Sequence, residues 1–165
     1  MIHPTAIIGK NVKLESGVEV GPYSFINGNV TVRKNTKIHT SVSITGNTTI
    51  GENNIIFPFC SIGSIPQDLK FNGEETYLKI GDSNTFREHC TVNTGTKGGG
   101  FNTIVGNGSL FMTGAHIAHD CIVGNNVIMA NQATLGGHVV IENNAVIGGL
   151  SAIHQFCRIG ELSMI

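Results

Sequence analysis

The chain has 165 residues, including 22 glycines and no tryptophan, with 13% charged residues and a formal net charge of −1. Scattered lysines and arginines at this net charge argue against nucleic acid as a partner. No apolar run approaches the length of a membrane-spanning helix, and the N-terminal residues MIHPTAIIGK lack the features of a signal peptide. We therefore expect one domain over residues 1–165, located in the cytoplasm without membrane insertion.

An apolar residue recurs at every sixth position along almost the whole chain. The first run extends from Ile2 to Ile62, a second from Ile80 to Val92, and a third, one residue out of phase, from Val105 to Ile165. The residue two positions earlier is small or β-branched in nearly every case, and glycine often follows the apolar residue. A period of six fits neither an α-helix nor a long amphipathic strand. Hexapeptide repeats are typical of parallel β-helices.

The geometry of such a repeat follows from the alternation of side chains along a strand. The apolar residue and the small residue two positions earlier share one face, so both point inward. Glycine or asparagine after the apolar residue suits a corner, because both tolerate positive φ. Three hexapeptides then make a triangular coil of 18 residues, and coils stack at about 4.8 Å. A β-sandwich would require irregular loops that interrupt the phase. We therefore predict an all-β fold, a parallel β-helix.

The four cysteines occupy the small, inward position of their hexapeptides: Cys60, Cys90, Cys121 and Cys157. This position predicts buried free thiols rather than zinc ligands or disulfides. Free thiols are consistent with a reducing cytoplasm.

Two segments interrupt the repeat, and we expect them to leave the coil as excursions. Residues 64–77 carry Asp68, Lys70 and two glutamates, and residues 95–101 have the sequence GTKGGGF. Insertions in a solenoid map to loops that often bind ligands. The alternative is a pair of tolerated surface insertions.

The strongest chemical signal is the segment AHIAHD at residues 115–120. Asp120 is the only carboxylate between Glu88 and Glu142, and it directly follows His119. Because a coil has 18 residues, residues 18 apart should stack in columns. The predicted columns are His119–Gly137–Gln155, Asp120–His138–Phe156 and His116–Thr134–Ala152.

These columns contain the parts of an acyl-transfer or deprotonation site. His119 can act as general base, Asp120 can polarise it, and the backbone N–H of Gly137 can bind an oxyanion. No serine, threonine or cysteine is evidently paired as a nucleophile, so direct attack by a substrate hydroxyl deprotonated by His119 is the simpler mechanism. The alternative is that these histidines are corner or surface residues.

A zinc site is another interpretation, since His116, His119 and His138 lie within one coil of each other. His116 and His119 are three apart on a strand, however, and should face opposite sides. We therefore favour a site without a metal ion.

Several motifs resemble one family over the whole chain: the hexapeptide pattern, PQDLK at 66–70, GTKGGG at 95–100, AHIAHDC at 115–121, GGHV at 136–139 and GGLSAIHQF at 148–156. The sequence is similar to the acyl-[acyl-carrier-protein]:UDP-N-acetylglucosamine O-acyltransferases, which catalyse the first step of lipid A biosynthesis. The resemblance implies a left-handed β-helix and a homotrimer with active sites between subunits. It implies transfer of a (3-hydroxy)acyl chain from acyl carrier protein to the 3-position of UDP-N-acetylglucosamine, with no metal and no bound cofactor.

The resemblance also implies roles for individual residues. His119 matches the general base, Asp120 the acid that orients it, and Gly137 the residue whose N–H binds the oxyanion. Six further residues match positions that contact the sugar nucleotide or the acylated product: Asp68, Lys70, His116, His138, His154 and Gln155.

Two departures from the family pattern stand out. Asn93 occupies a position where relatives often carry histidine, so we expect one substrate contact to differ there. The family continues for several coils and a C-terminal helical domain beyond the position of Ile165. On the resemblance, the chain is expected to be a truncated form with reduced activity.

Three other functions remain open from the residues. One is a different hexapeptide-repeat acyltransferase that uses acetyl-CoA or another sugar nucleotide. The second is a γ-class carbonic anhydrase-like metal site, and the third is a non-enzymatic binding scaffold. The residues leave open the acyl length, its hydroxylation, and whether the acceptor is a hydroxyl or an amine.

Overall fold

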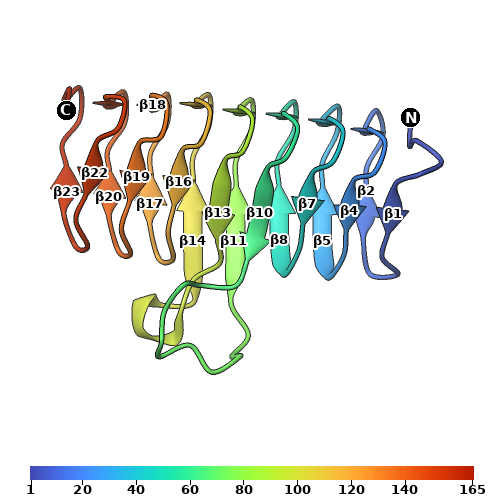
Figure 1. Ribbon diagram of the computed structural model, residues 1–165, viewed down its shortest axis with the longest axis horizontal. Helices are drawn as coiled ribbons and strands as arrows, with labels where there is room; N and C mark the ends of the chain where they lie inside the picture. The colour runs from blue at the N-terminus through green and yellow to red at the C-terminus, as the bar shows by residue number, and fades with distance from the viewer.

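The computed structural model describes residues 1–165, which form a triangular prism of stacked coils that runs from the N-terminus to the C-terminus (Figure 1). Three parallel sheets of eight, eight and seven strands form its walls. Consecutive strands belong to successive walls, so every circuit of the chain adds one strand to each wall. The predicted left-handed parallel β-helix is confirmed.

The strands are short, and most have two residues. The first wall contains β1 (Ile7–Ile8), β4 (Phe25–Ile26), β7 (Ser43–Ile44), β10 (Ser61–Ser64), β13 (Thr91–Asn93), β16 (His116–Ile117), β19 (Thr134–Leu135) and β22 (Ala152–Ile153). The second wall contains β2 (Lys13–Leu14), β5 (Asn29–Val32), β8 (Asn47–Ile50), β11 (Tyr77–Ile80), β14 (Asn102–Val105), β17 (Ile122–Val123), β20 (Val140–Ile141) and β23 (Arg158–Ile159). The third wall contains β3 (Glu19–Val20), β6 (Lys37–Ile38), β9 (Ile55–Ile56), β12 (Thr85–Phe86), β15 (Leu110–Phe111), β18 (Ile128–Met129) and β21 (Val146–Ile147).

The core fills the prism along its whole length. Residues at the sixth positions and two positions before them form one cluster of 32 buried side chains. Its largest members include Phe86 and Phe111, whose rings stack with centroids 4.7 Å apart in successive coils. Each short strand therefore points its alternate side chains inward, and these side chains together form a continuous core without helices or long strands.

The register between coils shows where the repeat is interrupted. Undisturbed coils pair residues 18 apart, as Asn29 does with Asn47. Asn47 pairs instead with Tyr77, and Tyr77 pairs with Asn102. The chain thus inserts 12 residues before β11 and seven before β14. An insertion of 12 preserves the period of six, whereas an insertion of seven shifts it by one residue.

Both inserted loops leave the prism at the corner between the first and second walls. Figure 1 shows them side by side as one projection near β11 and β14. The second loop contains the single helical element, the 3-10 helix η1 (Lys97–Gly99). No helix in the structure has the length and hydropathy needed to span a bilayer.

The same corner carries the candidate site in the coils that follow. Asp120, His138 and Phe156 occupy equivalent corner positions, each with φ between 60° and 64°. Stacking of identical corners therefore aligns these side chains beside the two loops.

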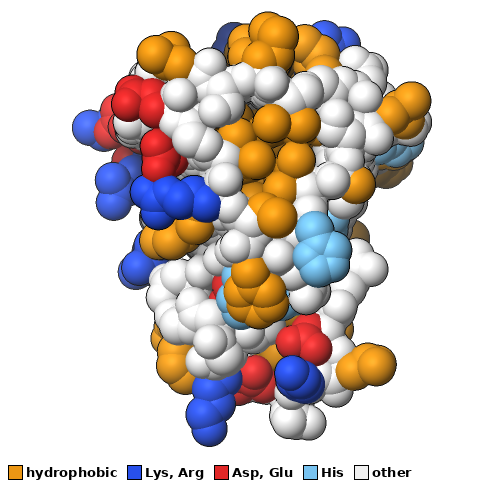
Figure 2. All heavy atoms as spheres, turned by 90° about the vertical axis from the view of Figure 1, so that its left-hand side faces the viewer, with side chains coloured by type: hydrophobic (Ala, Val, Ile, Leu, Met, Phe, Trp, Pro, Cys, Tyr) orange, Lys and Arg blue, Asp and Glu red, His pale blue; other side chains and the backbone are white.

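Three of the four cysteines are buried as expected, at Cys60, Cys90 and Cys121. The prediction for Cys157 is wrong, because this thiol is exposed. Cys157 lies in the last coil of the described chain, where no further coil covers the core. Figure 2, which faces this end of the prism, shows hydrophobic side chains in a column down its middle.

Candidate active site

His119 and Asp120 form a buried pair at the corner after β16. The Nδ1 atom of His119 lies 2.8 Å from Oδ2 of Asp120. The His119 side chain is 6% exposed and the Asp120 carboxylate is fully buried. An ionised carboxylate only accepts hydrogen bonds, so Nδ1 carries the proton and Nε2 keeps its lone pair. A buried pair with this tautomer is suited to general-base chemistry at Nε2.

Three further donors and acceptors fix Asp120. The backbone N–H of Thr96 donates to Oδ1 at 2.7 Å, and the Thr96 hydroxyl donates to Oδ2 at 2.6 Å. The N–H of Asp120 donates to the Thr103 hydroxyl at 2.8 Å. This last bond ties the corner at Asp120, where φ is 60°, to the preceding coil.

The next coil brings Gly137 against the His119 ring, in the column that the spacing predicts. A Cβ added to Gly137 would lie 2.6 Å from Nε2 and 3.0 Å from Nδ1. The imidazole of His119 therefore fills the space that a side chain at residue 137 would occupy. The N–H of Gly137 makes no backbone hydrogen bond, and neither does the equivalent N–H of Gln155. Of these two N–H groups, the one of Gly137 lies beside the His119 ring.

His138 and Phe156 stack in the column above Asp120. The rings of His138 and Phe156 are parallel, with centroids 4.5 Å apart, and the His138 ring meets His119 edge-on at 5.2 Å. Nε2 of His138 lies 3.7 Å from Oδ2 of Asp120, beyond hydrogen-bonding distance. His138 therefore packs against the His119–Asp120 pair without hydrogen-bonding to its carboxylate.

His116 lies in β16 and pairs with Thr134 of β19, as the spacing predicts. Its Nδ1 atom is 2.7 Å from the hydroxyl of Thr91 in the preceding coil. Burial lowers the pKa of His116, and the nearby His119 lowers it further. A neutral imidazole is thus favoured at this position.

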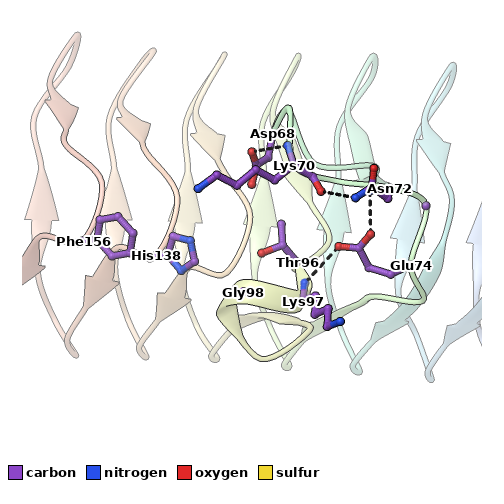
Figure 3. A pocket seen from close by; sticks show the side chains of 10 residues that line it. Asp68, Lys70, Asn72, Glu74, Thr96, Lys97, Gly98, His138 and Phe156 are labelled. Carbon is purple, nitrogen blue, oxygen red and sulfur yellow. Dashed lines mark hydrogen bonds between the residues drawn. The ribbon is translucent and has the colours of Figure 1, made fainter.

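A cavity of about 870 Å³ opens between the two loops and the corner. Figure 3 shows Asp68, Lys70 and Glu74 on the first loop and Thr96 on the second, with His138 and Phe156 across from them. The Lys70 side chain extends toward the coils that carry His138 and Phe156 (Figure 3). The Oδ1 atom of Asp68 accepts the N–H of Lys70 at 3.0 Å, which shapes this turn of the loop.

The two loops also contact each other. Glu74 accepts the N–H of Asn72 at 2.8 Å and the N–H of Lys97 at 3.3 Å (Figure 3). The backbone N–H of Glu74 itself lowers the pKa of the Glu74 carboxyl most, and the N–H groups of Asn72 and Lys97 lower it further. The charged wall of the cavity is therefore joined to the loop that contacts Asp120.

The remaining predicted residues lie near the end of the prism. His154 and Gln155 are exposed, and Nδ1 of His154 is 3.2 Å from the backbone oxygen of Gln155. A Cβ on Gly136 would lie 3.1 Å from Cγ of Gln155, so Gln155 packs against the coil below. Neither residue lines the cavity.

The three histidines considered as zinc ligands do not form one group. The ligand atoms that cluster within 4.8 Å belong to His119, Asp120 and His138, without His116. Within this group, Nδ1 of His119 and Oδ2 of Asp120 are already partners of each other. The geometry is that of a hydrogen-bonded pair with a neighbouring imidazole.

Asn93 is buried at the base of the first loop, and it does not line the cavity. Its amide nitrogen donates to the backbone oxygen of Ile65 at 3.1 Å, while its Oδ1 atom has no partner. The residue therefore anchors the start of the loop that carries Asp68 and Lys70.

Sequence reasoning missed Thr96, Thr91 and Thr103. Threonine is common in strands and loops, so nothing in its type singles out these three hydroxyls. Thr96 does lie inside the GTKGGG motif, which was considered only as a loop. Its contact with Asp120 spans 24 residues and depends on the inserted loop folding back over the corner.

Comparison with known proteins agrees with the hexapeptide-repeat fold. Residues 102–137 match the family model "Bacterial transferase hexapeptide (six repeats)". An acyl-[acyl-carrier-protein]–UDP-N-acetylglucosamine O-acyltransferase of Janthinobacterium sp. (strain Marseille) is 58% identical over 134 residues, which cover 81% of this chain and 51% of the relative. The corresponding protein of Neisseria gonorrhoeae is 57% identical over 134 residues, or 81% of this chain and 52% of the relative.

Solved structures give the same result. The UDP-N-acetylglucosamine O-acyltransferase of Moraxella catarrhalis RH4 superposes with a TM-score of 0.94 at 46% identity, covering 99% of this chain and 66% of that one. The chain belongs to the UDP-N-acetylglucosamine O-acyltransferase family. The Francisella novicida member has a TM-score of 0.97 at 35% identity, covering 99% of this chain and 60% of that one. The chain spans about half the length of the curated relatives of the family that it matches.

Proposed function

We propose that the chain catalyses transfer of an acyl group from acyl carrier protein to the 3-hydroxyl of UDP-N-acetylglucosamine, the first step of lipid A biosynthesis. The observation that carries the proposal is the buried pair of His119 and Asp120 beside Gly137. The activity for which the relatives are named supports the choice of substrates.

The reaction uses the lone pair on Nε2 of His119. Asp120 accepts the Nδ1 proton, so Nε2 is free to take the proton of the sugar hydroxyl as its oxygen attacks the thioester carbonyl. A C–O bond forms, and the carbonyl oxygen becomes an oxyanion that the N–H of Gly137 can stabilise. Collapse breaks the C–S bond, and the departing thiolate takes the proton from Nε2. The base is thereby regenerated without a covalent enzyme intermediate.

The cavity beside the pair suits a polar, anionic substrate. Lys70 and Lys97 can balance the charge of a diphosphate, while Asp68 and Glu74 offer acceptors for hydroxyl groups. Phe156, stacked on His138, adds an aromatic face for a sugar or a base. This composition supports a nucleotide sugar as acceptor.

We also propose the homotrimer and the contact with acyl carrier protein that the family resemblance implies. Substrate contacts of His116, His154 and Gln155 belong to the same proposal. A location in the cytoplasm remains a prediction, for which the free cysteines are the supporting observation.

The test combines the chain with UDP-N-acetylglucosamine and a mixture of acyl-acyl carrier proteins, followed by mass measurement of the product. Wild type is expected to form a monoacylated nucleotide sugar. His119→Ala is expected to lose at least about 100-fold in rate, because general-base catalysis contributes roughly 10²–10⁴-fold. His39→Ala provides a control, since His39 lies at another corner and stacks on Phe57.

Each competing function predicts a different outcome. Product formation with acetyl-CoA but not with acyl-acyl carrier protein would indicate another hexapeptide-repeat acyltransferase. Stoichiometric zinc with carbon dioxide hydration would favour the metal site, which the cluster of His119, Asp120 and His138 could hold. Unchanged function in His119→Ala would favour a binding scaffold.

A further inference from the structure

The second inserted loop folds back over the carboxylate of Asp120. Gly99 packs so closely on this carboxylate that a Cβ there would overlap it. Thr96, three residues earlier, is 5% exposed and donates to both carboxylate oxygens, at 2.7 Å from its backbone N–H and 2.6 Å from its hydroxyl. The loop thus excludes water from Asp120 and replaces it with two fixed donors.

The two donors determine how the carboxylate is oriented. Oδ2 accepts from both the Thr96 hydroxyl and Nδ1 of His119, whereas Oδ1 accepts from the Thr96 backbone. Two bonds from one residue to two different oxygens leave the carboxylate no freedom to rotate about its last bond. Oδ2 is therefore held toward Nδ1, and Nε2 remains the atom without a proton.

Other features of the loop indicate that this contact does more than hold the loop against the β-helix. None of the three residues of η1 is buried, so the turn that follows Thr96 adds no side chain to the apolar core. Thr96 nevertheless lines the cavity on one side and contacts Asp120 on the other. It is the residue through which the loop touches both substrate space and the histidine–aspartate pair.

We propose that Thr96 is a positioning residue for the acyl transfer, acting through Asp120 to fix the tautomer and direction of His119. The proposal rests on the proposed function and adds to it a purpose for the inserted loop. Thr96 does not exchange protons with substrate, so its effect should fall on the chemical step and not on substrate binding.

The experiment compares Thr96→Val, which removes the hydroxyl but keeps the backbone donor, with Thr96→Ser, which keeps both. Thr94→Val is the matched control, because Thr94 is 3% exposed in the same segment and its hydroxyl bonds to Thr76. A hydrogen bond to a charged group is worth enough to lower kcat by about 10- to 100-fold in Thr96→Val. KM should stay within about twofold, while Thr96→Ser and Thr94→Val should stay near wild type.

A second readout does not depend on turnover. In ¹⁵N-histidine-labelled protein, wild-type His119 is expected to show a proton on Nδ1 in a single, sharp resonance. In Thr96→Val this resonance should shift and broaden, and in Thr94→Val it should not. If wild type transfers no acyl group, the proposed function fails, and this resonance still decides whether Thr96 orients the pair.

Two results would overturn the proposal. One is an unchanged kcat in folded Thr96→Val, and the other is a lowered kcat with the Nδ1 resonance of His119 unaltered. Circular dichroism checks that each variant is folded, and Thr96→Ala replaces Thr96→Val if the latter does not fold.

Discussion

The imidazole of His119 rests directly on the backbone of Gly137, where a Cβ would lie 2.6 Å from Nε2. Real Cβ atoms do not approach a neighbour this closely, so any side chain at residue 137 must displace the ring. The ring of the proposed base therefore occupies the space that a side chain at residue 137 would need.

Gly137→Ala is expected to lower the acyl-transfer rate by about 100-fold, because the added methyl group moves Nε2 away from its position. The fold should persist, since Gly137 does not have positive φ. The matched control is Gly149→Ala, two residues after the apolar residue of its own hexapeptide, where a Cβ would meet its nearest atom at 3.4 Å. Steady-state rates and thermal unfolding of both variants check this, and equal activity in Gly137→Ala would contradict it.

Phe156→Ala should weaken binding of the sugar nucleotide while leaving the core intact. Phe156 is 72% exposed, lines the cavity and stacks on His138. Aromatic contacts of this type are worth about 0.5–1.5 kcal/mol, which corresponds to a roughly two- to tenfold rise in Kd.

Isothermal titration with UDP-N-acetylglucosamine measures this change. Phe59→Ala is the control, because Phe59 makes an equivalent stack with His89, centroids 5.1 Å apart, outside the cavity. Equal weakening by both substitutions would mean that the effect is not local.

His116 should make stability fall on acidification. Burial lowers its pKa from the ordinary 6.5, so the unfolded chain binds a proton near pH 6.5 that the folded chain resists. The unfolded state then holds more protons, and the free energy of unfolding decreases as the pH drops below about 6.5 toward the lower folded pKa. Above that window the effect is absent.

His116→Asn should flatten this part of the pH profile, measured by urea unfolding at a series of pH values from about 7 to 5. His154→Asn removes an exposed histidine and serves as the control. An unaltered slope in His116→Asn would show that other groups produce the acid sensitivity.

Phe111→Ala should be strongly destabilising, because Phe111 is 1% exposed and stacks on Phe86 in the middle of the prism. Removal of a buried phenylalanine side chain costs about 3–5 kcal/mol. Tyr23→Ala, at a residue that is 72% exposed, should change the free energy of unfolding much less. Urea denaturation of both variants makes the comparison, and a small effect at Phe111 would mean that the coils relax around the cavity.

Much of this structure could be predicted from residue spacing. The period of six specifies a strand, a corner and a return, and it placed His116 opposite Thr134 and His138 over Asp120. That reasoning works because each coil contacts only its neighbours, so sequence separation translates directly into distance along the prism. The prediction for Cys157 was wrong for the same reason, since burial also requires a following coil.

The relation between sequence separation and distance along the prism does not hold for the inserted loops. Their residues have no fixed partner 18 positions away, so the contact of Thr96 with Asp120 and of Glu74 with Lys97 could not be inferred from spacing. Sequence alone determined the solenoid, the positions of the two insertions in the chain, and the columns that place Gly137 beside His119 and His138 beside Asp120. The corner that the two loops share with these columns became visible only in the structure. Only the tertiary structure decided that one loop covers the carboxylate and that the imidazole fills the space of Gly137, because both depend on how irregular backbone folds back on a regular wall.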